Sequence, residues 1–419
     1  MQGDITPARF HHWRGDTGTR LTIAMLGYYL AVIAVITLVP FRFEMPDGFR
    51  PTMRWTLLDA SANVLLFLPL GFLQRLAGSG QADPGQVLRV TRGGSRVDPA
   101  ALQVLAIGLL ASTIIETIQI FEPARFASPM DIIANGAGAW AGALLCDRVA
   151  KWIRPDSQLV GRLSLEIPLM GLIYMLIPLL WLSSLAVGAD AERLGLLLLT
   201  GLFGGQLLAF VHRHRPGRPG LASVYAFALA AGLGTFVGVF PAVPQYPGPA
   251  LLLALAVAAF VRIRAGTGAR TGGDRRFERI ALRAAMPIFA TYLLSAAWFA
   301  RPDGPTTGID RIGILRTLEM VVSFTVLGYI VAEWRGRVAE KFGEAVRAVV
   351  MRALPLGALT IGLRFLPAAP AQALVWLVLT ILSSVYGAGL YRLQRAHVQQ
   401  LITAASAPRP AHGSREVAA

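Results

Sequence analysis

The sequence predicts an all-α fold: a polytopic integral membrane helix bundle of about 12 transmembrane helices, with both termini in the cytoplasm. Three observations lead to this fold class. The 419-residue chain is 54% hydrophobic and only 15% charged, with a mean hydropathy of +0.55, whereas soluble domains carry about 25% charged residues. Its apolar residues gather in runs of about 20, which is the length that crosses a bilayer as a helix. Its basic residues are distributed unevenly among the connections between these runs.

The apolar runs define the expected helices in order. The first run follows a polar tail and ends at Leu38-Val39-Pro40-Phe41, which offers no small-residue cleavage site, so we expect an uncleaved first span. Glycines and prolines interrupt the seventh, eighth and eleventh runs. The runs are 21–40, 57–76, 100–121, 130–149, 166–188, 194–211, 221–240, 248–263, 282–300, 312–333, 347–366 and 371–391.

Lysine and arginine alternate in abundance from one connection to the next. The two tails and the even-numbered connections carry 30 of the 39 basic residues, and the odd-numbered connections carry 8. Because cytoplasmic loops are enriched in Lys and Arg, we expect a plasma (inner) membrane protein with both tails in the cytoplasm. The basic stretches His212–Arg218 and Arg262–Arg283 then act as topology signals and contact anionic lipid head groups. Despite the net charge of +15 we expect no nucleic-acid partner, because no aromatic platform is interleaved with them.

Three acid–amide pairs interrupt otherwise apolar runs, and the two members of each pair share a helix face because they lie three or four residues apart. Under the predicted topology all three pairs fall in the outer third of the membrane, and short connections make consecutive helices neighbours. Two arginines lie in the adjoining outer connections. The sequence therefore predicts a substrate- or lipid-binding site at this depth. Its candidate residues are Arg42, Asp59, Asn63, Glu116, Gln119, Arg125, Asp131 and Asn135.

Structural explanations for these residues remain open. Thr56–Asp59 and Ser128–Asp131 both match a helix-starting capping box, so each aspartate could simply cap a helix. Glu116 lies in the C-terminal half of a helix, where the macrodipole disfavours an anion. It therefore requires a partner, Arg125 or Arg42, either in a ligand site or in a purely structural ion pair. The amides could equally form hydrogen-bonded links between helices.

Several motifs follow one another between Thr37 and Arg148. They are Leu38-Val39-Pro40-Phe41, Asp59 with Asn63-Val-Leu-Leu-Phe-Leu-Pro-Leu-Gly71-Phe, Ile115-Glu116-Thr-Ile-Gln119-Ile-Phe, Pro123-Ala-Arg125 and Asp131-Ile-Ile-Ala-Asn135-Gly136-Ala-Gly138. In this combination the chain resembles the VanZ-like membrane family. The resemblance implies a four-helix membrane unit of a family first associated with low-level resistance to a lipid-bearing glycopeptide antibiotic. It implies a fold unit and a location, and no reaction.

The charged connections divide the chain into five parts. We expect a cytoplasmic tail (1–20), the VanZ-like four-helix domain (21–150), a middle membrane scaffold of four helices (151–280), a second four-helix unit (281–402) and a disordered cytoplasmic tail (403–419).

The second four-helix unit resembles the first and is interpreted as a degenerate copy. Phe67–Phe72 recurs as Phe324–Tyr329, and Arg125-Phe126, beyond the third run, recurs as Arg364-Phe365, beyond the eleventh. The copy has kept outer arginines and lost the acids; the alternative is chance recurrence of common residues. In this alignment the positions of Asp59, Asn63 and Glu116 are taken by Arg316, Met320 and Pro355.

No motif of a recognised catalytic class is present in the sequence. It lacks a glycine-rich phosphate loop, a dinucleotide fingerprint, a His-Glu-x-x-His pattern and a nucleophile elbow. Its six histidines lie in the tails or in a cytoplasmic connection, away from the acids. We therefore expect no cofactor and no metal, and the sequence leans against an enzyme without deciding the question.

Three functions remain open. The chain could bind or reposition an amphipathic or lipid-linked anionic molecule of the cell envelope, with Arg42 and Arg125 contacting phosphate or carboxylate oxygens. It could be an intramembrane enzyme acting on a lipid-linked substrate, with Glu116 as the acid or base and Asp59 and Asp131 holding a divalent cation. It could also be a proton-coupled transporter. Binding is favoured, because no nucleophile or histidine accompanies the acids.

Overall fold

A computed structural model describes most of the chain. The described residues are 16–45, 56–78, 98–123, 125, 127–152, 157–187, 191–214, 221–267, 277–300, 311–336, 341–365 and 370–406. Within these ranges the regular structure is entirely helical and contains twelve long α-helices, which confirms the prediction of an all-α fold. The long helices are α1 (Asp16–Leu38), α2 (Leu57–Gly78), α4 (Pro99–Gln119), α5 (Pro129–Trp152), α6 (Ser157–Ala186), α7 (Leu194–His214), α8 (Leu221–Val239), α9 (Pro247–Thr267), α10 (Phe277–Phe299), α11 (Arg311–Arg335), α12 (Phe342–Phe365) and α13 (Pro370–Ser406). Two 3₁₀ turns, η3 (Ala191–Arg193) and η4 (Phe240–Ala242), precede α7 and follow α8.

Nine of the described helices are long and apolar enough to cross a membrane. Two shorter apolar stretches, Ile23–Leu38 and Gly171–Ala186, lie within α1 and α6. The chain is therefore a multi-pass membrane protein. Alanine and glycine occupy much of the length of helix α5, which packs against α2 and α4.

Several helices extend past the apolar runs from which they were predicted. Helix α1 begins at Asp16, within the predicted tail 1–20, and α13 continues to Ser406, past the predicted run end at 391 and into the predicted tail 403–419. Hydropathy marks only the part of a helix that suits hydrocarbon, whereas the backbone hydrogen-bond ladder continues through polar turns. The remainders of both predicted tails, 1–15 and 407–419, lie outside the described residues.

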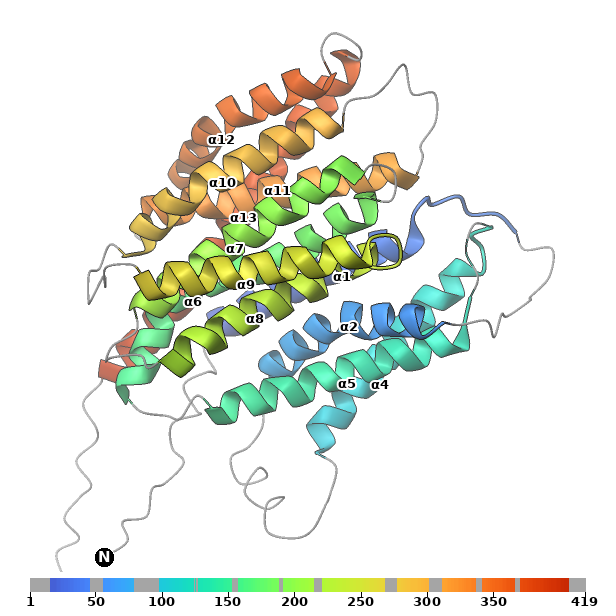
Figure 1. The fold of residues 1–419 in the computed structure, drawn as a ribbon, viewed down its shortest axis with the longest axis horizontal. Coiled ribbons are helices and arrows are strands. Elements are labelled where there is room, and N and C mark those ends of the chain that lie inside the picture. The colour runs from blue at the N-terminus through green and yellow to red at the C-terminus, as the bar shows by residue number, and fades with distance from the viewer. Residues whose placement is uncertain are drawn as a thin grey trace, which may run out of the picture.

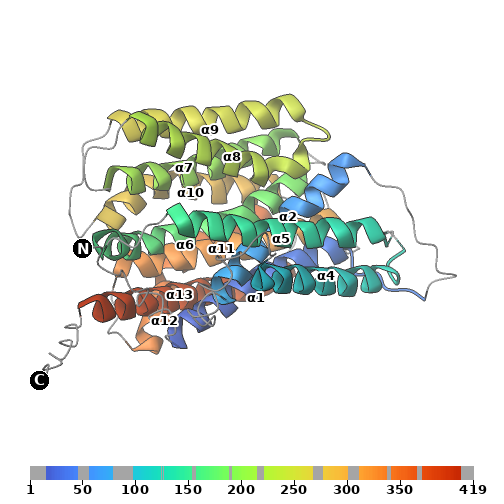
Figure 2. The same ribbon diagram turned by 90° about the horizontal axis from the view of Figure 1, so that it is seen from below.

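The helices form one bundle with the N-terminal unit on one side. Helices α2, α4 and α5 lie together at one side of the molecule in Figure 1, and α10 and α12 lie at the opposite side. Helix α1 contacts α2, α4, α6 and α13, so it connects the N-terminal unit to the rest of the bundle. Helices α8 and α9 pack against each other and against α7 (Figure 2).

Helix α11 lies at the centre of the largest apolar core. Its residues from Val322 to Glu333 are all buried, which is expected of a helix that is apolar around its whole circumference. It contacts α6, α10, α12 and α13. The core around it also includes side chains of α1, α2 and α7.

Small residues allow α2 and α5 to approach closely. A Cβ at Gly71 would lie 1.9 Å from the carbonyl oxygen of Ala139, and one at Gly142 would lie 2.1 Å from that of Leu68. These backbones are nearly in contact, as in other membrane helix pairs packed through small residues. Val64 of α2 lies against Gly138 of α5, and Leu68, four residues later in α2, lies against Gly142, four residues later in α5. The two helices therefore run parallel.

Helices α11 and α13 repeat this contact with the same spacing. A Cβ at Gly328 would lie 2.0 Å from the carbonyl oxygen of Ser384, and one at Gly387 would lie 1.9 Å from that of Thr325. In both helix pairs the two close contacts are three residues apart along each helix. The two helix pairs thus share one packing geometry, and the interpretation of residues 281–402 as a copy of the N-terminal unit stays a prediction.

One part of the sequence alignment of the two units is wrong. Helix α12 continues to Phe365, so Arg364 lies in its last turn rather than beyond the helix. Arg125, its proposed counterpart, lies in the connection after α4, which ends at Gln119. Arg364 remains within the helix and inside the bundle, where its guanidinium stacks over the ring of Trp376 of α13.

Candidate functional site

The ends of α1 and α4 are tied together by two of the predicted site residues. The side-chain amide of Gln119 donates a hydrogen bond to the carbonyl of Thr37 at 2.7 Å. The guanidinium of Arg125 donates to the carbonyls of Ile36 at 3.0 Å and Val39 at 3.3 Å. These carbonyls belong to the C-terminal end of α1, where helix oxygens lack intrahelical partners and the macrodipole favours a cation. Arg125 therefore caps α1.

Glu116 is buried in the last turn of α4, with 6% of its surface exposed. Its carboxylate accepts a hydrogen bond from the backbone N–H of Ser128 at 2.8 Å. Arg125 and Asp131 lie within electrostatic range of this carboxylate. The direct partner of Glu116 is therefore a backbone amide at the start of α5, and the predicted arginine contributes only through its charge.

Asp59 and Thr56 form a reciprocal cap at the start of α2. The Asp59 N–H donates to the Thr56 hydroxyl at 3.1 Å, and the Asp59 carboxylate accepts from the Thr56 hydroxyl at 2.6 Å and from its N–H at 3.3 Å. The capping-box explanation is thus confirmed for Asp59. The same explanation is wrong for Asp131, because the Ser128 hydroxyl is buried without a hydrogen-bond partner among the described residues.

The acids of α2, α4 and α5 nevertheless lie near one another. Asp131 accepts a hydrogen bond from Asn63 and lies within electrostatic range of Asp59. Asp131 also acts on Glu116. The structure thus brings the two aspartates, Asn63 and Glu116 together where α2, α4 and α5 meet.

Asn135 lies about one helical turn deeper than this group. Its amide nitrogen donates to the Ser112 hydroxyl of α4 at 2.9 Å, and both side chains are buried. The Asn135 carbonyl oxygen has no partner in the described part of the chain. This amide therefore links α4 to α5.

Glu122 was missed by the sequence reasoning. It is 1% exposed, and one of its oxygens accepts a hydrogen bond from the backbone N–H of Arg42 at 2.7 Å, whereas the other has no partner within the described ranges. Its position could have indicated this role, because Glu122 lies only three residues before Arg125 in the short connection after α4. By holding the backbone at residue 42, Glu122 positions the exposed Arg42 side chain.

Arg311, at the start of α11, is a second residue missed by the sequence reasoning. Burial and the positive charge of Arg311 lower the pKa of Arg125, while Glu122 and Glu116 act in the opposite direction. The beginning of α11 therefore adjoins the end of the N-terminal unit at which α1 and α4 terminate. Nothing in local sequence spacing relates residues 125 and 311.

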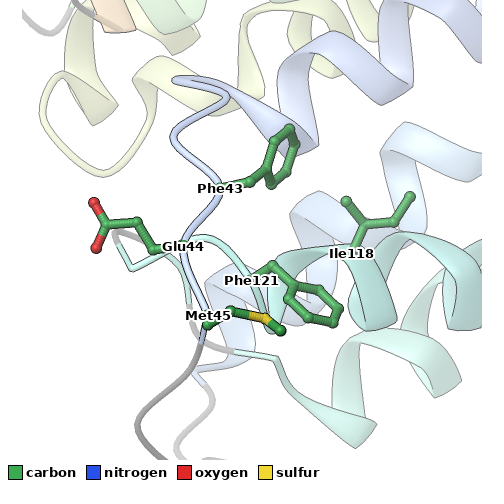
Figure 3. Close-up of a pocket in the computed structure, with 5 residues that line it drawn as sticks. All are labelled: Phe43, Glu44, Met45, Ile118 and Phe121. Carbon is green, nitrogen blue, oxygen red and sulfur yellow. The ribbon is translucent and has the colours of Figure 1, made fainter.

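Two surface cavities flank the segment that follows α1. One, of about 500 Å³, is lined by Pro40, Phe41, Arg42 and Ile314. The other, of about 350 Å³, is lined by Phe43, Glu44, Met45, Ile118 and Phe121. In Figure 3 the Met45 and Phe121 side chains lie next to each other, whereas Glu44 points away from them.

Of the eight predicted site residues, only Arg42 lines either cavity. The others have protein partners or electrostatic neighbours, and their role in ligand binding remains a prediction. Within the described ranges, no three or more His, Cys, Asp or Glu side chains form a group that could hold a metal ion.

The fold and this polar region define a class: a multi-pass membrane protein whose N-terminal helices gather acids, amides and arginines at one end. The family model described as VanZ/LLP1 matches residues 19–154. The N-terminal part of the chain is thus a VanZ/LLP1 domain, which confirms the resemblance found in its motifs. No curated protein and no solved structure matches the chain.

Proposed function

We propose that this VanZ-type membrane protein binds or repositions an amphipathic anionic molecule, such as a lipid-linked envelope precursor, at the outer end of its N-terminal unit. The observation that carries the proposal is the segment after α1, where Arg42 lines one cavity together with Phe41 and Ile314. An acidic head group with an apolar tail requires both kinds of contact.

The head group is assigned to the arginines. A guanidinium forms strong, often bidentate hydrogen bonds with phosphate or carboxylate oxygens. Arg42 supplies this contact at the cavity, and Arg125 and Arg311 add positive charge behind it. The uncompensated oxygen of Glu122 is suited to accept a hydrogen bond from a hydroxyl or ammonium of the same ligand.

The apolar part of the ligand is assigned to the second cavity. Phe43 is 50% exposed and Met45 is 86% exposed, although both are large apolar side chains. They lie directly after Arg42 in the chain and line one cavity with Ile118 and Phe121. Burying such side chains against an acyl chain gains about 25 cal/mol for each Å² removed from water.

The membrane topology completes the proposal. The concentration of basic residues in the tails and even connections supports cytoplasmic termini in the inner membrane. With this orientation, the end of α1, the end of α4 and the start of α5 face the outer leaflet, where the ligand is expected. By family resemblance, a lipid-bearing glycopeptide antibiotic is one candidate ligand, which would extend the proposal to low-level resistance.

The test is identification of the lipids that co-purify with the full-length protein in a neutral detergent. We expect wild type to be enriched in an anionic amphiphile that Arg42→Ala loses. Arg347→Ala is the matched control, because Arg347 is an exposed arginine near the other end of a spanning helix, and it should retain the ligand. Equal amounts of bound lipid in wild type and Arg42→Ala would refute the proposal.

The same preparation distinguishes binding from chemistry. Glu116→Gln keeps an acceptor for the Ser128 N–H and removes the negative charge. A variant that still binds the amphiphile but no longer supports function in cells would favour the enzyme interpretation, with Glu116 as acid or base. Retained binding together with retained function would assign Glu116 to structure.

A further inference from the structure

Glu319 is the centre of a buried polar cluster in the C-terminal half of the chain. It lies in α11 with 1% of its surface exposed. Its carboxylate accepts hydrogen bonds from the Ser183 hydroxyl of α6 at 2.6 Å and the Tyr292 hydroxyl of α10 at 3.1 Å. Its other oxygen pairs with the guanidinium of Arg193, which is completely buried just before α7. Four elements therefore meet at one carboxylate.

Arg364 is a second arginine of this cluster. It lies in the last turn of α12 and is 7% exposed. Its guanidinium stacks over the ring of Trp376, 4.3 Å from the centroid, and lies 5.1 Å from that of Phe365. The charges of Glu319, Arg193 and Arg316 all act on it.

The hydrogen-bonding capacity of the two buried arginines is not satisfied. In the described part of the chain, the Nε and Nη1 groups of Arg193 and of Arg364 are buried and have no hydrogen-bond partner. Arg193 is paired with Glu319, whereas Arg364 forms no ion pair within the described ranges. Burying a charge is costly unless it is paired, so the guanidinium of Arg364 requires an anion.

The cluster lies at the same end of the bundle as the ligand site proposed above at Arg42, which we call the VanZ site. It joins the last turns of α6, α10 and α12 to the first turns of α7, α11 and α13. The start of α11 also adjoins the first site, since Ile314 lines the cavity beside Arg42. The residues that form the cluster belong to other helices, however, so it is a separate site.

We propose that Arg364 binds the phosphate group of a second ligand at the C-terminal end of α12. Stacking on Trp376 covers the guanidinium face and leaves its N–H edge directed to an oxyanion, the geometry in which arginine recognises phosphate. Glu319 holds Arg193 in place and reduces the repulsion among the arginines. A free phosphate ion and a lipid phosphate head group share this chemistry.

The test is fluorescence titration of the purified full-length protein in a neutral detergent. One arm uses inorganic phosphate, and the other uses short-chain phosphatidylglycerol, each compared with sodium chloride at equal ionic strength. We expect a saturable change in tryptophan fluorescence that Trp376→Phe abolishes. A response to the lipid alone would assign a head-group site, and a response to phosphate, with or without the lipid, would assign a site open to the free ion.

Two variants connect this response to the cluster. Arg364→Gln should weaken binding about tenfold or more, because it removes the charge-assisted contacts. If that variant does not fold, Arg364→Lys keeps the charge, loses the fork of donors and should still weaken binding severalfold. Arg347→Ala, at an exposed arginine near the other end of the same helix α12, should leave this response unchanged. No saturable response with either probe, or an unchanged response in both Arg364 variants, would overturn the second site.

Discussion

The close contact between α11 and α13 predicts a large difference between two glycines of one helix. In Gly387→Ala the new Cβ would lie 1.9 Å from the Thr325 carbonyl oxygen, whereas ordinary contact begins at 3.4 Å. The difference, 3.4 − 1.9, is about 1.5 Å, and because both atoms belong to helix positions that move only with their backbones, the helices must separate by an amount of this order. Gly389, two residues on, has nothing within 4 Å of an added Cβ.

The expected magnitudes follow from these distances. Overpacking typically costs 1–3 kcal/mol, and a backbone clash belongs at the upper end of that range. Alanine regains up to about 1 kcal/mol over glycine inside a helix, which is the only effect expected for Gly389→Ala. Because both variants share this gain, they should differ by the cost of the clash, about 2–3 kcal/mol, measured as the free energy of unfolding in mixed micelles with increasing sodium dodecyl sulfate. Equal stability of Gly387→Ala and Gly389→Ala would refute the close packing of these helices.

Three further predictions concern the N-terminal unit and can be measured by the same unfolding assay. Glu116→Ala should destabilise the protein by about 1–3 kcal/mol because the Ser128 N–H loses its acceptor in a buried position, whereas Glu116→Gln should lose less than half of that. Arg125→Gln should cost about 1–3 kcal/mol by removing charged hydrogen bonds to the end of α1, and hydrogen exchange should increase in the last turn of α1 and not in its middle. Thr56→Val should cost about 1 kcal/mol by breaking the cap of α2; an unchanged stability would mean that the cap does not persist in detergent.

The helices and the local caps were predictable from the sequence because both are short-range properties. A run of about 20 apolar residues can satisfy its backbone in a membrane only as a helix, and the Thr56–Asp59 box is formed within one turn. The order of polar motifs was likewise sufficient to identify the VanZ/LLP1 domain. Helix ends were less predictable, because polar residues continue α1 and α13 beyond the apolar runs.

The partners of the charged residues were not predictable, because they are chosen across the fold. Glu319 pairs with Arg193 over a separation of 126 residues, and no local spacing relates them. Sequence alignment of the two units treated the second as having lost its acids, and it overlooked Glu319, one turn after Arg316. Glu116 was expected to pair with an arginine and instead accepts a hydrogen bond from a backbone amide, a group that every residue except proline carries and that leaves no mark in the sequence.

In both halves of the bundle, the residues that allow close helix packing differ from the polar residues at the helix ends. Contacts at Gly71 and Gly328 involve backbone atoms of the partner helix, so the close helix packing in each unit depends on small residues and not on the polar side chains at the helix ends. Where α1 and α4 end, the first unit combines acids, amides and arginines, whereas the cluster at Glu319 has arginines near one carboxylate. Under the two proposals, the polar residues at the two sites set the head-group preference and the helix contacts do not depend on them. The arginine variants at positions 42 and 364 should then change ligand binding independently of each other, whereas alanine at Gly71 or Gly328 should disturb the whole unit to which it belongs.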